Sequence, residues 1–89
     1  MKAYITVVGK DKIGIIASVS KLLSDNLINI EDLSQTILQG MFTMIMAVDI
    51  SAAQKPLDEI AVLLAEEGKR LGMEITIRHA DIFNAMHRI

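Results

Sequence analysis

Hydrophobic and polar positions follow two different periods along this chain, and each change of period predicts a new element. Residues 3–8 (AYITVV) are rich in β-branched residues, which predicts a strand with Ile5 and Val7 on one face. From Gly14 onward apolar residues recur at helical spacing, so we expect a helix that ends near Asn26, a residue that tolerates a left-handed C-terminal conformation. The apolar stripe of this helix consists of Ile15, Val19, Leu22 and Leu23.

The middle of the chain has the pattern of a β-hairpin with a Gln-Gly turn at residues 39–40. Residues 28–38 form its first strand and residues 41–50 its second. The acidic pair at residues 31–32 weakens the alternation of the first strand, which predicts a bulge or an edge position there. The inward face of the second strand consists of Phe42, Met44, Met46, Val48 and Ile50.

The last part of the chain predicts a second helix, a fourth strand and a short C-terminal helix. Pro56 suits the first turn of the second helix, because its missing N–H would have no partner there, and Gly72 ends this helix. Residues 73–79 (MEITIRH) form a strand with Ile75 and Ile77 inward. The second helix buries Leu57, Ile60, Ala61, Leu64, Gly68 and Leu71, and the C-terminal helix aligns Ile82, Phe83, Met86 and Ile89.

The order of these elements predicts an α+β fold, the ferredoxin-like βαββαβ sandwich, as a single domain over residues 1–89. Two helices would cover one face of a four-stranded antiparallel sheet. The other face would carry a fairly apolar group of side chains, and contiguous apolar surface usually marks a contact. This group consists of Val8, Met41, Ile45 and Ala47.

Composition narrows the class of protein. A chain of 89 residues builds a small core, so we expect a homodimer or a higher homo-oligomer. The chain has no cysteine and no signal peptide, which favours a cytoplasmic location. No apolar segment is long enough to cross a membrane. The net charge of -2 is dispersed, which argues against a nucleic-acid partner.

The loop VVGKDKIGII, with Gly9 and Gly14, has the spacing of half a phosphate-binding P-loop. A P-loop needs Lys and then Ser or Thr after its second glycine, but Ile15 and Ile16 stand there. The backbone N–H groups at the start of the first helix would instead suit a small carboxylate. The alternative is that the two glycines only shape the turn.

Other chemistry finds little support in the sequence. No nucleophile-base arrangement or paired carboxylates are evident, so we expect no enzyme and no cofactor. His79, Asp81 and His87 match no usual metal-ligand spacing, so we expect no metal site.

The segment from Val7 to Gln35 resembles the ACT domain. That family combines a strand, a short turn with an acidic and a basic residue and a glycine, an apolar helix, and Asn-Ile opening the second strand. The matching residues here are Asp11, Lys12, Gly14, Ile15, Asn29 and Ile30. The ending FNAMHRI looks like the tail of small stand-alone ACT-domain proteins.

The resemblance implies a regulatory module that senses a small molecule, such as an amino acid, as a homo-oligomer. It implies a ligand held by the loop of one chain and by Asn29 of a neighbouring chain. We expect Asn29, at the start of the second strand, to lie next to the glycine loop. The loop residues implied in binding are Asp11, Lys12, Ile13, Gly14 and Ile15.

Three alternatives stay open. Asp11 is equally suited to cap the first helix, and Asn29 is slightly better suited to end the turn that follows it unless a partner chain covers this residue. The whole domain is also compatible with a ligand-free interaction module that docks on a metabolic enzyme or a regulator. Ile13, which stands where the family usually has proline, and Gly9, which offers no polar side chain, favour this last alternative.

Overall fold

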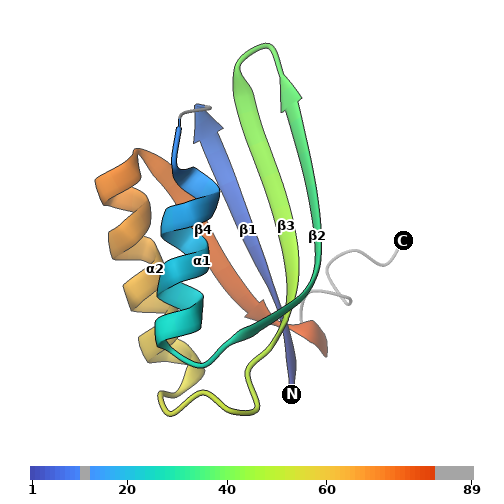
Figure 1. Ribbon diagram of the computed structural model, residues 1–89, viewed down its shortest axis with the longest axis vertical. Coiled ribbons are helices and arrows are strands. Elements are labelled where there is room, and N and C mark those ends of the chain that lie inside the picture. The colour runs from blue at the N-terminus through green and yellow to red at the C-terminus, as the bar shows by residue number, and fades with distance from the viewer. Residues whose placement is uncertain (11–12, 82–89) are drawn as a thin grey trace.

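The computed structural model describes residues 1–10 and 13–81 and confirms the ferredoxin-like fold. Four strands form one antiparallel sheet in the order β2-β3-β1-β4. Both helices cover the same face of this sheet (Figure 1). The predicted C-terminal helix lies outside the described residues. The elements are β1 (Lys2–Lys10), α1 (Ile15–Asp25), β2 (Asn29–Leu38), β3 (Met41–Asp49), α2 (Leu57–Leu71) and β4 (Met73–His79).

The core lies between the sheet and the two helices, and the predicted alternation places its residues correctly. Ile5 and Val7 of β1 are fully buried, as are Ile60 and Leu64 of α2. In β3 every second residue is buried, while the residues between them face away from the helices. Each strand therefore has one face in the core and one face outside it. The buried residues of β3 are Phe42, Met44, Met46 and Val48.

The end of α1 differs by one position from the prediction. Asn26 ends the helix, but its φ is -102°, and the left-handed residue is Leu27 with a φ of 60°. The N–H of Ile28 donates to the Leu23 carbonyl at 2.9 Å, and the N–H of Leu27 donates to the Ser24 carbonyl at 3.1 Å. This is a Schellman motif, which places the left-handed residue after the cap. Ile28 and Leu23 are both buried, so packing sets the position of the motif.

The hairpin between β2 and β3 has the predicted turn. Gln39 and Gly40 have φ values of 53° and 82°, as a two-residue type I′ turn requires. The pairing of β2 with β3 shifts by one residue between Ile30 and Asp32, which is the predicted bulge. Since β2 is also an edge strand, both the bulge and the edge position predicted for residues 31–32 are confirmed.

The second helix begins and ends as predicted. Pro56 precedes the first helical residue and its carbonyl accepts the N–H of Ile60 at 3.1 Å. Gly72 ends the helix with a φ of 73°. Gly68 lies against β4, because a Cβ there would stand 2.6 Å from the Met73 carbonyl oxygen. The α2–β4 contact therefore depends on a glycine.

Candidate functional site

The first turn of α1 presents backbone donors to open space. Gly14 is the N-terminal cap, and its carbonyl accepts the first helical bond, from the N–H of Ser18 at 2.9 Å. The N–H groups of residues 15–17 have no partner within the helix, because they precede that bond. A Cβ at Gly14 would have no atom within 4 Å. This helix end therefore suits a carboxylate, which the partial positive charge of the helix attracts.

The remaining loop residues play different roles. Ile15 is buried in the core, so only its backbone is available to a ligand. Ile13 is completely exposed. Asp11 and Lys12 lie outside the described residues. The glycine at residue 14 has a φ of 90°, so its conformation, and not only its small size, calls for glycine.

Asn29 lies at the other end of the sheet from Gly14, and the prediction that it lies next to the glycine loop is wrong. Asn29 pairs with Asp49, which pairs with Lys2, whereas the loop follows the far end of β1. Seven residues of strand separate Lys2 from Gly9, or about 23 Å. The cause is α1, which runs back along the whole sheet before β2 begins (Figure 1). Within one chain, a small ligand cannot touch both Gly14 and Asn29.

Asn29 instead lines a groove between α1 and β2, on the flank of the domain. The groove has a volume of about 550 Å³, and Asn29 is exposed in it. Ser20 and Ser24 of α1 line the same groove and add two hydroxyl groups. Sequence reasoning missed both serines, although their spacing of four places them on one side of the helix. The lining residues are Ser20, Ser24, Leu27, Ile28, Asn29, Ile30 and Ala52.

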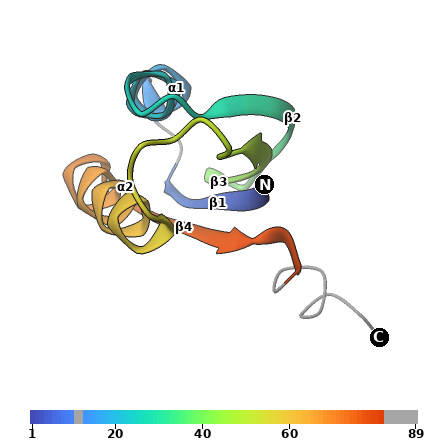
Figure 2. The same ribbon diagram turned by 90° about the horizontal axis from the view of Figure 1, so that it is seen from below.

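The same flank exposes aliphatic side chains. In β2, Leu33 pairs with Met46 and Ile37 pairs with Phe42, so both point to the side of the sheet that carries the helices. Leu33 is 37% exposed and Ile37 is 55% exposed, because α1 does not extend over β2 (Figure 2). We call Leu33, Ile37 and the groove the α1–β2 flank. An exposed apolar edge strand of this kind is a template for pairing with another chain.

The described residues match the family model of the ACT domain over residues 3–78. The chain belongs to the ACT domain family. A UPF0237 protein of Clostridium acetobutylicum is 53% identical over 89 residues, which is the whole of both chains. A UPF0237 protein of Pyrobaculum aerophilum is 44% identical over 87 residues, which covers 98% of this chain and 97% of the relative.

Solved structures agree with this assignment. An ACT domain protein from Streptococcus pneumoniae has a TM-score of 0.83 and 42% identity, and the match covers 93% of each chain. A formyltetrahydrofolate deformylase from Pseudomonas syringae has a TM-score of 0.80 at 21% identity, over 88% of this chain and 27% of that enzyme. The second likeness shows the fold alone. The ACT domain is a regulatory ligand-binding module, and the UPF0237 relatives match this chain over nearly their whole length.

A charged cluster stands at the Asn29 end of the ACT domain. The Asp49 carboxylate accepts the Ser51 hydroxyl at 2.6 Å and the Ser51 N–H at 2.9 Å, and the terminal amine of Met1 lies 3.3 Å away. The hydrogen bonds from Ser51, with the Met1 amine beside them, hold the pKa of Asp49 well below its usual range. Lys2 forms an ion pair with Glu31 at the bulge. Asp49 and Glu31 are thus engaged within the chain.

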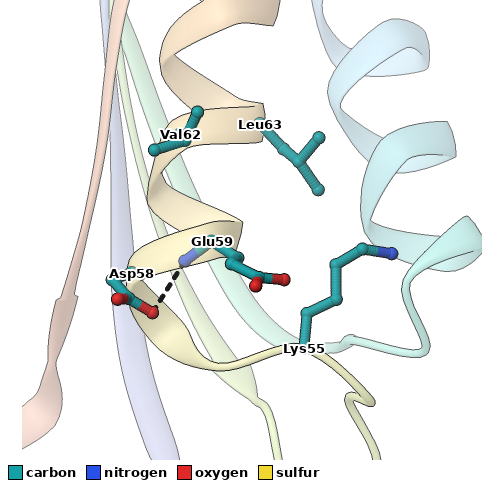
Figure 3. Close-up of a pocket in the computed structure, with 5 residues that line it drawn as sticks. All are labelled: Lys55, Asp58, Glu59, Val62 and Leu63. Atoms are coloured by element: carbon teal, nitrogen blue, oxygen red, sulfur yellow. Dashed lines mark hydrogen bonds between the residues drawn. The ribbon is translucent and has the colours of Figure 1, made fainter.

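The rest of the ACT domain offers weaker sites. A shallow concavity of about 370 Å³ lies on the outer side of α2 around Val62 (Figure 3), and it contains none of the predicted site residues. The N–H of Asp81 donates to Nδ1 of His79 at 3.2 Å, and His87 lies outside the described residues. Residues 1–10 and 13–81 contain no group of three metal ligands and no helix long enough to cross a membrane.

Proposed function

We propose that this ACT domain senses an amino acid as a homo-oligomer, with the ligand bound between the first turn of α1 in one chain and Asn29 of a second chain. The observation that carries the proposal is the placement of the two half-sites. Asn29 lines the groove of the α1–β2 flank, Gly14 begins α1 at the opposite end of the sheet, and the flank exposes apolar side chains. A two-fold axis through the middle of the flank exchanges its ends, which brings each half-site to the other.

The register of β2 shows where this axis would pass. If two β2 strands pair antiparallel with Leu33 beside the partner's Leu33, then Asn29, which the bulge leaves three cross-strand rows from Leu33, stands beside the partner's Thr36. Thr36 is in the same row as Thr43 and Val8, next to the row of Gly9 that leads into the glycine loop. Pairing of this kind also covers the exposed backbone of the edge strand.

The chemistry of the two half-sites is complementary to an amino acid. The N–H groups of α1 bind its carboxylate, and an exposed interaction of this kind contributes about 0.3–1 kcal/mol. The amide oxygen of Asn29 accepts a hydrogen bond from its ammonium group, and bonds to charged groups contribute about 1.5–3 kcal/mol. The groove beside Asn29 receives the side chain of the ligand.

The second candidate is an interaction module without a ligand, which docks on a metabolic enzyme or a regulator. The exposed aliphatic residues of the flank favour it, because they need a cover of some kind. The fully exposed Ile13 adds an apolar residue beside the loop. This alternative needs no role for Asn29.

A screen of the twenty amino acids by thermal shift separates the two candidates. A ligand at one hundred times its dissociation constant adds about 2.7 kcal/mol to the free energy of unfolding, and so raises Tm. Asn29→Ala should remove most of the shift, while Gln54→Ala, an exposed amide outside the flank, should not. If no amino acid raises the Tm of the wild-type protein, the interaction module is the better candidate.

Mixing two inactive variants tests whether the site is shared. Asn29→Ala removes one half-site. Ala17→Glu blocks the other, because a carboxylate at the third helical position occupies the free N–H groups while it stabilises the helix. A heterodimer of the two variants has one of its two sites intact and makes up about half of an equal mixture, so mixing should restore binding to about a quarter of the wild-type capacity. No recovery on mixing, with exchange of subunits verified, excludes a site shared between chains.

A further inference from the structure

The face of the sheet that carries no helix has an apolar centre and a charged margin. Tyr4, Thr6, Val8 and Ala47 are half-buried there, and Ile45 is 36% exposed. We call this surface the open face. Strand alternation also places six charged residues on the open face, at its edges or at the ends of its strands. They are Asp32 on β2, Glu74 and Arg78 on β4, and Lys2, Lys10 and Asp49 at the strand ends.

Two polar groups near the centre of the open face already pair with each other. The hydroxyl groups of Thr6 and Thr76 form a hydrogen bond of 2.5 Å across β1 and β4. Among the described residues no buried side-chain nitrogen or oxygen lacks a hydrogen-bond partner. A second surface can therefore cover this centre without leaving the threonine hydroxyls unpaired.

We propose that the open face binds the open face of a second copy of this chain, around a two-fold axis that crosses the strands at Thr6 and Ile45. Thr6 lies in one cross-strand row with Ile45 and Thr76. The axis exchanges the two ends of every strand. The result is a sandwich of two sheets, as in other proteins with two packed sheets about 10 Å apart.

Residues at equal distances on either side of this row then meet. Ile45 packs on the partner's Ile45, and Val8 packs on the partner's Tyr4. On β4, Glu74 lies two residues before Thr76 and Arg78 two residues after it, so Glu74 meets the partner's Arg78. Apolar residues thus meet apolar residues at the centre, and opposite charges meet at the edge.

Symmetry selects this axis over one that runs along the strands. The side-by-side pair of the proposed function has its axis at Leu33, one residue from the row of Ile45, because Ser34 pairs with Ile45. An axis across the strands passes about one residue from that axis, so a shift of one row makes the two meet and close a tetramer of four chains. An axis along the strands would place Asp32 opposite the partner's Arg78, but it would generate an open-ended array. This choice of axis, the comparison of areas and the expected tetramer rest on the proposed function.

The area of the open face agrees with an assembly of pairs. Four strands about 4.8 Å apart and seven residues long cover roughly 19 by 23 Å, or on the order of 450 Å² per chain. A stable interface needs about 800 Å² on each side. A side-by-side pair presents about twice the area of one chain, which is enough, so pairs of chains should stack more tightly than single chains.

Sedimentation equilibrium of aliphatic-to-lysine variants tests the proposal. Wild type and Val62→Lys, which alters an exposed valine on the outer side of α2, should be tetramers. Ile45→Lys should be a dimer, because two lysines meet at the axis. Ile37→Lys should lose the side-by-side pair, and the double variant should be a monomer. This separates failure of the open face from failure of the flank.

The mass and Tm of Ile45→Lys decide whether a second copy of the chain covers the open face. An unchanged mass would overturn the proposal. A lower Tm with an unchanged mass would also overturn it, and would indicate that the chain covers this face with its own residues 82–89.

A charge exchange tests the direction of the axis. Glu74→Arg and Arg78→Glu should each raise the dissociation constant of the tetramer at least about tenfold, because each places like charges opposite each other. The double exchange should restore the wild-type value to within about threefold. Asp32→Arg is the control and should have little effect. If Asp32→Arg dissociates the tetramer and Glu74→Arg does not, the axis across the strands is excluded.

Discussion

Gly14 is the residue on which the candidate site depends most directly, since it joins the loop to the first turn of α1. Its φ of 90° is a conformation that L-residues rarely adopt, while the space in front of its Cα is open. Strain and steric access are therefore two separate reasons for glycine at this position. A simple substitution such as Gly14→Val changes both at once, so its effect cannot be assigned to either.

Replacing Gly14 with D-alanine by chemical synthesis separates these reasons. A D-residue is unstrained at this φ, so we expect the free energy of unfolding to stay within about 0.5 kcal/mol of wild type, whereas L-alanine should lower it by about 1–2 kcal/mol. Denaturant unfolding measures both values. If the D-alanine protein is stable but loses the amino-acid thermal shift, close approach of the ligand to the backbone is supported. Equal loss of stability in both proteins would contradict the assigned φ.

Asp49 gives the molecule an acid-sensitive contact. Its pKa is lowered in the folded chain, so the unfolded chain binds more protons in acid, and stability falls as the pH drops below the ordinary aspartate value of about 3.9. We expect Asp49→Asn to be less stable than wild type at neutral pH. The two stabilities should converge as the pH falls below that value, which urea unfolding across a pH series measures. A difference that is constant over the series would exclude the ionised carboxylate as its cause.

At the scale of elements, the periodicity of the sequence was enough to predict all six helices and strands of residues 1–10 and 13–81. The reason is that each element has one buried face, and burial enforces a period of 2.0 or 3.6. The position of Leu27 could not be predicted in this way. Asparagine tolerates the left-handed conformation better than leucine does, but burial of Ile28 and Leu23 set the Schellman motif one residue later.

Leu27 should therefore be a position where glycine stabilises the protein. A left-handed conformation costs an L-residue about 1–2 kcal/mol, and Leu27 is 51% exposed, so it loses little by truncation. We expect Leu27→Gly to raise the free energy of unfolding by about 0.5–1 kcal/mol. Thermal or denaturant unfolding measures this. Leu22→Gly, in the interior of the same helix, is the control and should destabilise the protein.

The candidate site was predictable only in part. The residue types could be chosen from the sequence, but the end of the sheet at which each residue lies could not. The loop glycine and Asn29 were singled out from the sequence, and the ferredoxin-like fold was predicted correctly. The order of strands does not say at which end of a strand a residue lies. Because α1 returns along the full length of the sheet, Asn29 starts β2 at the far end from Gly14 (Figure 1). The groove with Ser20 and Ser24 depends on how α1 lies beside β2, which periodicity does not determine.

At the scale of the whole molecule, the domain has two apolar surfaces that its own described residues leave uncovered. One is the α1–β2 flank and the other is the open face. A chain of 89 residues has a small core, and coverage of such surfaces is a common source of additional stability.

We therefore expect the protein to be at least a dimer at micromolar concentration. Its Tm should rise with protein concentration, because association stabilises the folded chain by mass action. Light scattering gives the mass, and thermal unfolding at several concentrations gives the second observation. A monomer at micromolar concentration with a constant Tm would contradict this expectation, and with it the two proposed interfaces.

The separation of Gly14 and Asn29 at opposite ends of the sheet has a consequence for how a cell would set the sensitivity of such a protein. In the proposed arrangement a chain that holds half of each site binds nothing alone, so ligand affinity and subunit affinity would be reciprocally linked. Dilution of the protein lowers the apparent ligand affinity, and ligand tightens the dimer by the same factor. The threshold of the response would then follow the expression level of the sensor, and a change in synthesis rate would retune it without any mutation.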